Sequence, residues 1–205
     1  MLRLFFALPL ALPLSLLAQV TNADLEKSPN ANWLTYAGDY RGTRHSPLTQ
    51  ITTANANQLT AKWVHRVPRA DGLRVTPLVH QGVMYVALPN ALRALDARSG
   101  RLIWEFRDTR AKKANVTRGA ALFEDSVYIV TSDCYLSALD RRTGAVRWQK
   151  QYADATPSTV YCSAAPVVVK DKVIVGIAGA DQSLRGFLAA RSAKTGDEVW
   201  RIFTV

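Results

Sequence analysis

Two cysteines, Cys134 and Cys162, are the residues whose chemistry is simplest to read from the sequence. In an oxidising compartment they can form a disulfide bond, and in a reducing one they remain thiols. A pair of free, buried thiols fits the sequence equally well. The residues alone leave both alternatives open.

Positive charge is the second chemical feature of the chain. Lys and Arg number 26 against 16 Asp and Glu, which gives a formal net charge of +10 at neutral pH. Such a surplus favours an anionic partner: nucleic acid, an acidic membrane or an acidic small molecule. The cations are scattered and form no run of five or more. We therefore interpret most of them as solvated outer faces, and we do not expect nucleic-acid binding.

A repeated pattern indicates which elements position these residues. The sequence A-x-x-x-x-[ST]-G-x-x-x-W occurs at 94–104, 138–148 and 190–200. The steps between its tryptophans are 148 − 104 = 44 and 200 − 148 = 52, and Trp63 lies 41 residues before the first. A period of roughly 40–50 residues is typical of four-stranded propeller blades. Helical repeats do not fit, because the apolar residues alternate or run in short blocks.

Each copy of the pattern makes sense as a turn between two strands. Asp and Ser/Thr side chains can hydrogen-bond nearby backbone, and glycine accepts a positive φ. A tryptophan at one fixed strand position is expected to pack between neighbouring repeats, where it buries much apolar surface. Three unrelated hairpins with core tryptophans are the alternative interpretation.

The pattern predicts an all-β fold, a partial β-propeller. From residue 74 onward we expect three four-stranded antiparallel blades, with one extra strand around Trp63. Residues 59–205 would form this propeller, and residues 19–58 an irregular N-terminal segment. In such blades the end of a second strand and the start of a first strand share one face. Cys134 and Cys162 should therefore lie on the same face.

Residues 1–18 are predicted to be a secretory signal. One arginine precedes an apolar run that contains two prolines and ends at Ala18. The run is short for a spanning helix, so we expect no stable membrane span and a periplasmic or secreted protein.

The sequence resembles the PQQ-dependent (quinoprotein) alcohol and glucose dehydrogenases. The similarity rests on four stretches: GDYRGTRHSPL near the N-terminus, TPLVHQGVMYVALPNALRALDARSGRLIW, TRGAALFEDSVYIV and APVVVKDKVIVGIAGADQSLRGFLAA. The resemblance implies an eight-bladed propeller that holds PQQ on its axis and uses Ca²⁺. Because family members continue for several more blades, it also implies that this chain is an N-terminal fragment.

The resemblance implies a set of site residues. Arg118 matches an arginine near the reactive quinone oxygens, where a guanidinium would stabilise developing negative charge. Ser163 matches a hydroxyl that binds a PQQ carboxylate. Ala178, Gly179 and Ala180 match small residues that let the backbone approach PQQ, and Asp181 replaces a glutamate that binds Ca²⁺.

Two departures from the family pattern concern charge. Lys112 and Lys113 stand where many members have two adjacent cysteines, and Arg74 stands where they have an acidic residue. Two interpretations are open. In one, the site holds an anionic ligand in another way, since the two lysines, Arg74 and Arg118 could all face the carboxylates of PQQ. In the other, the site has lost its ability to bind the cofactor.

Two functions follow as hypotheses. The first is the N-terminal part of a periplasmic PQQ-dependent dehydrogenase, which would oxidise an alcohol or sugar and pass electrons to an acceptor. The chain itself is expected to be inactive, because no residue in it matches the family's catalytic aspartate. The alternative is a non-catalytic propeller that serves as a binding or assembly scaffold. No c-type haem motif, C-x-x-C-H, is present in these residues.

Overall fold

Three four-stranded antiparallel sheets follow one another along the chain in the computed structural model. The structure describes residues 19–67, 73–111, 116–156, 160–179 and 183–204. The strands of blade 1 are β1 (Leu78–His80), β2 (Val83–Leu88), β3 (Ala91–Asp96) and β4 (Leu102–Arg107). Those of blade 2 are β5 (Ala120–Phe123), β6 (Ser126–Val130), β7 (Tyr135–Asp140) and β8 (Val146–Gln151). Those of blade 3 are β9 (Val167–Val169), β10 (Lys172–Gly176), β11 (Phe187–Ser192) and β12 (Glu198–Phe203). The predicted all-β partial propeller is confirmed.

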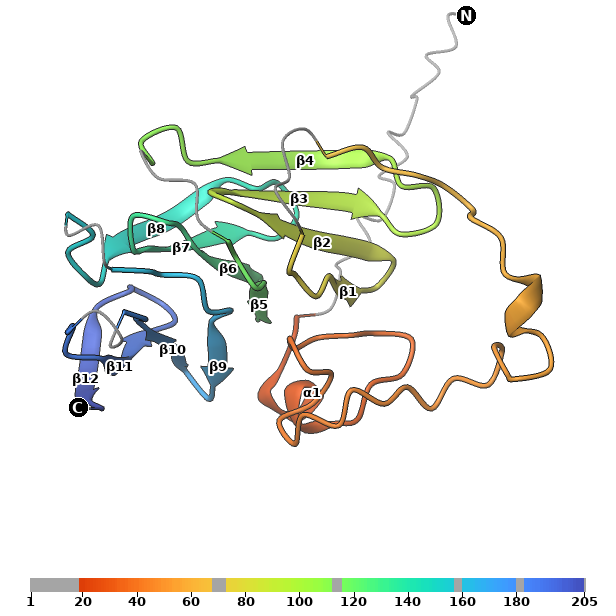
Figure 1. The fold of residues 1–205 in the computed structure, drawn as a ribbon, viewed down its shortest axis with the longest axis horizontal. Coiled ribbons are helices and arrows are strands. Elements are labelled where there is room, and N and C mark those ends of the chain that lie inside the picture. Colours follow the sequence, from red (N-terminus) through yellow and green to blue (C-terminus); the bar gives the residue numbers. More distant parts are fainter. Residues whose placement is uncertain (1–18, 68–72, 112–115, 157–159, 180–182, 205) are drawn as a thin grey trace, which may run out of the picture.

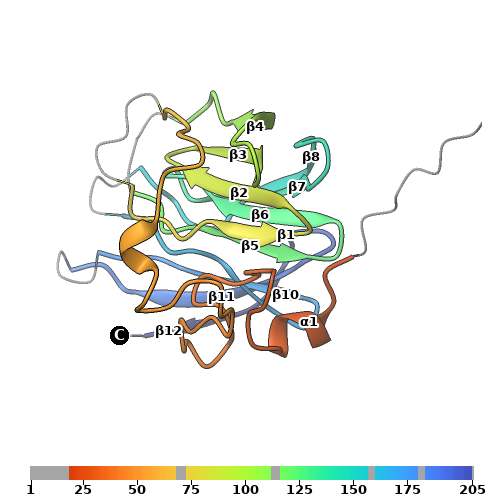
Figure 2. The ribbon, with the colours of Figure 1, turned by 90° about the vertical axis from the view of Figure 1, so that its right-hand side faces the viewer.

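The first strands of the blades lie next to one another (Figure 1). β5 contacts both β1 and β9, whereas the fourth strands lie at the outside of the arc. The N-terminal segment contains helix α1 (Asn22–Glu26), which lies on the inner side of the blades, and the short 3₁₀ turn η1 (Ala56–Gln58), which lies away from the blades before the chain reaches the outer part of blade 1 (Figures 1 and 2). Isolated bridges join it to the sheets, between Val20 and Glu124 and between Trp33 and Val79. These bridges hold the N-terminal segment against β1 and against the residue that follows β5.

The extra strand expected around Trp63 is not formed. Residues 59–67 adopt no strand conformation. They are attached to blade 1 mainly through side chains: Trp63 Nε1 donates to the Ala97 carbonyl at 3.1 Å, and His65 Nδ1 lies 3.0 Å from the Gly100 carbonyl. A strand needs a backbone ladder with a neighbour, and these contacts do not provide one.

The tryptophans take equivalent positions, as the repeat predicted. Trp104, Trp148 and Trp200 pair with Ala94, Ala138 and Ala190 in their own blades, each beside a register shift. The indole of each of the first two also reaches the next blade, where Nε1 donates to a turn carbonyl: Trp104 to Arg141 at 3.2 Å and Trp148 to Ala193 at 3.1 Å. The tryptophans therefore join consecutive blades.

The side-chain hydrogen bonds expected in the turn of each repeat are present in blades 1 and 2. In blade 1, Asp96 Oδ1 accepts hydrogen bonds from the backbone of Arg98 and Ser99 at 3.0 and 2.9 Å. In blade 2, Asp140 Oδ1 accepts the equivalent two hydrogen bonds from the backbone of Arg142 and Thr143. Burial would raise the pKa of Asp140, but hydrogen bonds from the Arg147 side chain and from the two backbone amides lower it to about 2.

Glycine 144 is required by the packing between blades. It has φ +75°, and a Cβ built there would lie 2.6 Å from Cε3 of Trp104. Gly144→Ala should therefore lower the free energy of unfolding by about 2–4 kcal/mol, from left-handed backbone strain and overpacking together. Gly82→Ala is the matched control, because Gly82 has φ +78° and open space around its Cβ position. Urea unfolding curves in which the two variants lose equal stability would contradict the docking role of Trp104.

Arg141 fills the space between blades 1 and 2. Its side chain is fully buried, Nη1 donates to Nδ1 of His80 at 3.1 Å, and Nη2 lies 3.6 Å from the Asp125 carboxylate. Since a guanidinium only donates, Nδ1 must accept, and the neutral imidazole carries its proton on Nε2. Burial lowers the pKa of His80, Arg141 lowers it further, and the carboxylate of Asp24 opposes these effects.

The lowered pKa of His80 predicts that the folded protein loses stability in mild acid. Because the folded-state pKa of His80 lies below its ordinary value of 6.5, the unfolded chain binds a proton first as the pH falls. Stability should be fully present above pH 6.5 and decrease below it, with a slope of at most about 1.4 kcal/mol per pH unit. Urea unfolding at several pH values between 7.5 and 5 measures this slope. His80→Gln, which keeps an acceptor but does not titrate, should flatten it, and an unchanged slope would assign the effect to other groups.

No helix in the described part of the chain is both long and apolar enough to cross a membrane.

Candidate cofactor-binding site

The segment before β5 links all three blades at the inner edge. The backbone N–H of Arg118 donates to the Ser163 carbonyl at 3.0 Å, and the Arg118 carbonyl accepts from the Thr76 N–H at 3.4 Å. Thr76 precedes β1 and Ser163 precedes β9, so these bonds tie together the chain entering each first strand. The backbone of Arg118 is thus fixed from both sides.

The Arg118 and Ser163 side chains form a direct pair. Nη1 of Arg118 donates to the Ser163 hydroxyl oxygen at 2.5 Å. Arg118 is exposed and Ser163 is half-buried. A guanidinium carries five N–H donors and this contact uses one, so the group keeps donors that it can direct at an anionic ligand.

A concave surface of about 380 Å³ opens beside this pair. Arg118 and Ser163 supply its polar edge, while small and aliphatic side chains form most of the rest, among them Ala164, Ala165, Ile174, Val175, Ile177 and Leu188. Tyr161 and Ala178 also line it, and their backbones exchange hydrogen bonds of 3.1 and 2.9 Å. The arrangement combines one positive group with a largely apolar wall, which suits a flat organic anion.

The structure brings together some of the residues that the sequence singled out. Arg118, Ser163 and Ala178 line the concavity. Gly179 follows directly, is buried and has φ +130°, a conformation that side-chain-bearing residues rarely adopt. Arg74 is exposed and lies two residues before Thr76, but it is not among the residues that line the concavity. Lys112, Lys113, Ala180 and Asp181 lie outside the described residues.

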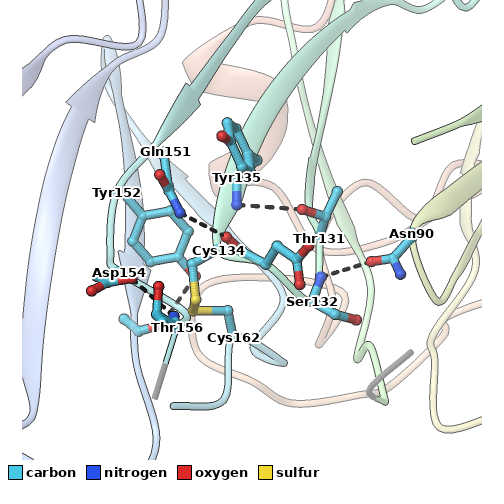
Figure 3. Close-up of a disulfide and its surroundings, with 12 residues drawn as sticks. Asn90, Thr131, Ser132, Cys134, Tyr135, Gln151, Tyr152, Asp154, Thr156 and Cys162 are labelled. Atoms are coloured by element: carbon cyan, nitrogen blue, oxygen red, sulfur yellow. Dashed lines mark hydrogen bonds between the residues drawn. A yellow bond between two sulfur atoms is a disulfide. The ribbon is translucent and has the colours of Figure 1, made fainter. Parts of the chain in front are cut away.

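A disulfide bond joins Cys134 to Cys162 (Figure 3), and Cys162 directly precedes Ser163 in the segment before β9, here called the Ser163 loop. The sequence had left this bond open. The two Cα atoms are 5.2 Å apart and both residues are buried. Tyr152 lies beside the bond, and its N–H donates to the Cys134 carbonyl at 3.0 Å. The disulfide thus attaches the residue next to Ser163 to the β6–β7 turn of blade 2.

Sequence reasoning missed two features of the site. One is Tyr161, whose neighbour Cys162 was noted only for its thiol. The other is the direct Arg118–Ser163 hydrogen bond, which joins residues 45 positions apart in the sequence. The shared location of the inner-strand starts predicts that Arg118 and Ser163 lie close together, but it does not predict the direct hydrogen bond.

Comparison with known proteins identifies the family. The family model described as glucose/ethanol/alcohol dehydrogenase, beta-propeller domain, under the name PQQ, matches residues 33–204. The chain belongs to the PQQ alcohol dehydrogenase propeller family. Its relatives include the quinohemoprotein alcohol dehydrogenase ADH IIB of Pseudomonas putida, with 39% identity over all of this chain and 31% of the relative. A 1-butanol dehydrogenase (cytochrome c) of Thauera butanivorans is 39% identical over 77% of this chain and 24% of its own length.

Solved structures of the PQQ family agree with the fold. Quinohemoprotein alcohol dehydrogenase ADHIIG of Pseudomonas putida HK5 superposes with a TM-score of 0.84 and 36% identity, over 92% of this chain and 29% of that one. A europium-containing methanol dehydrogenase superposes with a TM-score of 0.80 and 33% identity, over 88% of this chain and 33% of that one. The chain therefore spans about a quarter to a third of the length of these PQQ-family proteins.

The family's metal has no complete site among the described residues. Within those ranges no group of three or more His, Cys, Asp or Glu side chains is placed to hold a metal ion. The assignment of Ca²⁺ to Asp181 stays a prediction.

Proposed function

We propose that the chain supplies one wall of a PQQ-binding site in a dehydrogenase that oxidises an alcohol or sugar. The observation that carries the proposal is the Arg118–Ser163 pair at the edge of an apolar concavity. Membership of the PQQ family supports it. A second part of the proposal is that this chain alone has no turnover. It is supported by the small part of the relative ADH IIB, 31% of its length, that the chain covers.

The described residues fit an anionic, planar cofactor. The Arg118 guanidinium matches a carboxylate or quinone oxygen, and the Ser163 hydroxyl can donate its own hydrogen to a carboxylate while accepting from Arg118. Ala164 and Ala165 leave space for a ring system. The local backbone is held by hydrogen bonds and by the disulfide, so little ordering is needed on binding.

When bound, PQQ would accept the electrons of the substrate, and the protein's residues would set its position and electrostatics. Arg118 would hold negative charge at one edge of the ring system. Ser163 would fix the guanidinium so that its remaining donors face the ligand. The apolar wall would exclude water and strengthen the charge interaction in a region of low dielectric constant.

A chimera tests the proposal. Residues 33–204 would replace the matching third of ADH IIB, whose sequence is 39% identical. The purified chimera would be supplied with PQQ and Ca²⁺, and PQQ retention and dye-linked alcohol oxidation would be measured. Retention with turnover supports the dehydrogenase assignment. The isolated 205-residue chain, tested in parallel, is expected to show no turnover.

Failure of the chimera is interpretable through a second variant. If it folds but does not retain PQQ, the changes Asp181→Glu, Lys112→Cys and Lys113→Cys are introduced together. Restored retention would attribute the loss to those substitutions. If a folded chimera with these changes still retains no PQQ, the scaffold alternative replaces the proposal.

We also propose that the protein is exported to the periplasm. The apolar residues 4–18 and the Cys134–Cys162 disulfide support this location, because disulfides persist in oxidising compartments. A fusion of residues 1–30 to alkaline phosphatase in a bacterial host should be active. An inactive, cytoplasmic fusion would refute export.

A further inference from the structure

A second hollow, of about 590 Å³, lies between blades 2 and 3. It shares no lining residue with the concavity at Arg118. Three aromatic side chains, Phe123, Tyr128 and Trp148, form part of its wall. Ala193 also lines it, in the turn between β11 and β12. The proposed function does not use this hollow.

Backbone contacts define the place of Ala193 in its blade. Its N–H donates to the Asp171 carbonyl at 2.9 Å. Its own carbonyl accepts from the Tyr128 hydroxyl at 3.1 Å and from Trp148 Nε1 at 3.1 Å. Both donors come from the preceding blade, so Ala193 lies at the junction of blades 2 and 3.

Arg141 has the same set of contacts one blade earlier. Its N–H donates to the Asp125 carbonyl at 3.1 Å. Its carbonyl accepts from the Tyr85 hydroxyl at 3.1 Å and from Trp104 Nε1 at 3.2 Å. Residues 141 and 193 are therefore equivalent positions in successive blades, although the arginine side chain continues beyond Cβ to a guanidinium group and the alanine side chain does not.

The two junctions differ in what fills them. Between blades 1 and 2, the buried guanidinium of Arg141 lies 3.6 Å from the Asp125 carboxylate and 3.1 Å from His80. Between blades 2 and 3, the alanine side chain ends at Cβ, and the hollow is open. The substitution of alanine for arginine thus leaves a space where the neighbouring junction holds a cation.

The wall of the hollow keeps groups that suit a guanidinium. Asp171 occupies the place of Asp125, because each accepts from the N–H of the equivalent residue. Phe123 occupies the place of His80: each is the last residue of a first strand and pairs with the first residue of the second. A planar cation can stack on the ring of Phe123 or Trp148 while it pairs with the carboxylate.

We propose that this hollow is a binding site for the guanidinium group of an arginine. Four charged side chains line the hollow: Glu124 and Asp171 are acidic, and Arg147 and Lys194 are basic. The Arg147 guanidinium is engaged with Asp140 at 2.7 Å. Lys172 pairs with Asp171 at 2.6 Å but is not part of the lining, and the exposed Asp171 carboxylate can accept from a second cation. The ligand is either free arginine or an arginine side chain of a polypeptide.

The test uses the 205-residue chain and three probes, with calorimetry and the intrinsic tryptophan fluorescence, to which Trp148 contributes, as readouts. N-acetyl-arginine amide represents an arginine within a polypeptide, and N-acetyl-citrulline amide is its neutral analogue of the same shape. We expect the arginine probe to bind roughly tenfold more tightly, from ion pairing and stacking together. Free L-arginine distinguishes the sources: tighter binding than the amide would indicate the free amino acid, and equal or weaker binding a polypeptide side chain.

Two variants connect binding to this hollow. Ala193→Arg should occupy the hollow with its own guanidinium, abolish binding of N-acetyl-arginine amide and raise the thermal midpoint. Ala97→Arg is the matched control in blade 1, because the Ala97 carbonyl likewise accepts from a tryptophan, Trp63. That control should leave probe binding unchanged. If Ala193→Arg does not fold, Asp171→Asn, whose side chain is 77% exposed, should weaken binding severalfold.

Equal affinity for the arginine and citrulline amides would overturn the proposal. Arginine-selective binding that persists unchanged in both Ala193→Arg and Asp171→Asn would also overturn it, since the selectivity would then arise elsewhere on the basic surface.

Discussion

Arg118→Gln in the chimera with ADH IIB should weaken PQQ retention by roughly tenfold to a hundredfold. The change keeps the side chain polar but removes the positive charge, and hydrogen bonds to charged groups contribute more than neutral ones. Arg118→Lys should recover only part of the loss, because an ammonium keeps the charge but not the planar fork. Retained PQQ after gel filtration, quantified by its absorbance against added cofactor, measures the effect.

The matched control for Arg118 is Arg98→Gln. Arg98 is also exposed, but it lies in the β3–β4 turn and does not line the concavity. Both variants remove one positive charge from the chimera. Equal losses of PQQ in the two variants would show that the whole basic surface, and not the Arg118 site, attracts the cofactor.

Removing the Cys134–Cys162 disulfide should lower the free energy of unfolding of this chain by about 3–4 kcal/mol. The bond closes a loop between residues 28 positions apart, and freeing it returns conformational entropy to the unfolded chain. The variant is Cys134→Ala with Cys162→Ala, and equilibrium urea unfolding is the measurement. The loss is a large fraction of the stability of an ordinary domain.

The reduced protein with intact cysteines is the control for the alanine variant. Both lack the bond, but only the variant loses the buried sulfur atoms, so their difference reports packing alone. A variant as stable as the oxidised protein would contradict a structural bond between the β6–β7 turn and the Ser163 loop.

The blades could be predicted from the sequence because their causes are local. Asp140, Thr143 and Gly144 form a turn through contacts within a few residues, and Trp148 follows at a fixed strand position. The recurrence of this unit then gives the architecture. The strand expected near Trp63 failed for the opposite reason: strand formation depends on a hydrogen-bonding neighbour, which the local sequence does not reveal.

Features that join distant segments were not predictable in the same way. The sequence RRTG reads as an exposed turn, yet Arg141 is buried against His80, 61 positions earlier. The disulfide could be placed on one face from the blade geometry, but whether the thiols met depended on the path of the chain between β8 and β9. The proximity of Arg118 and Ser163 follows from the shared location of the inner-strand starts, but their direct hydrogen bond depends on the conformations of the two side chains.

A crystal structure of the chimera grown with PQQ tests the central claim most directly. Our account predicts that PQQ lies over the wall formed by Ala164 and Ala165, with one of its oxygens about 2.7–3.2 Å from a nitrogen of the Arg118 guanidinium. PQQ bound elsewhere, or bound on the axis with the Arg118 guanidinium out of hydrogen-bonding range, would contradict it.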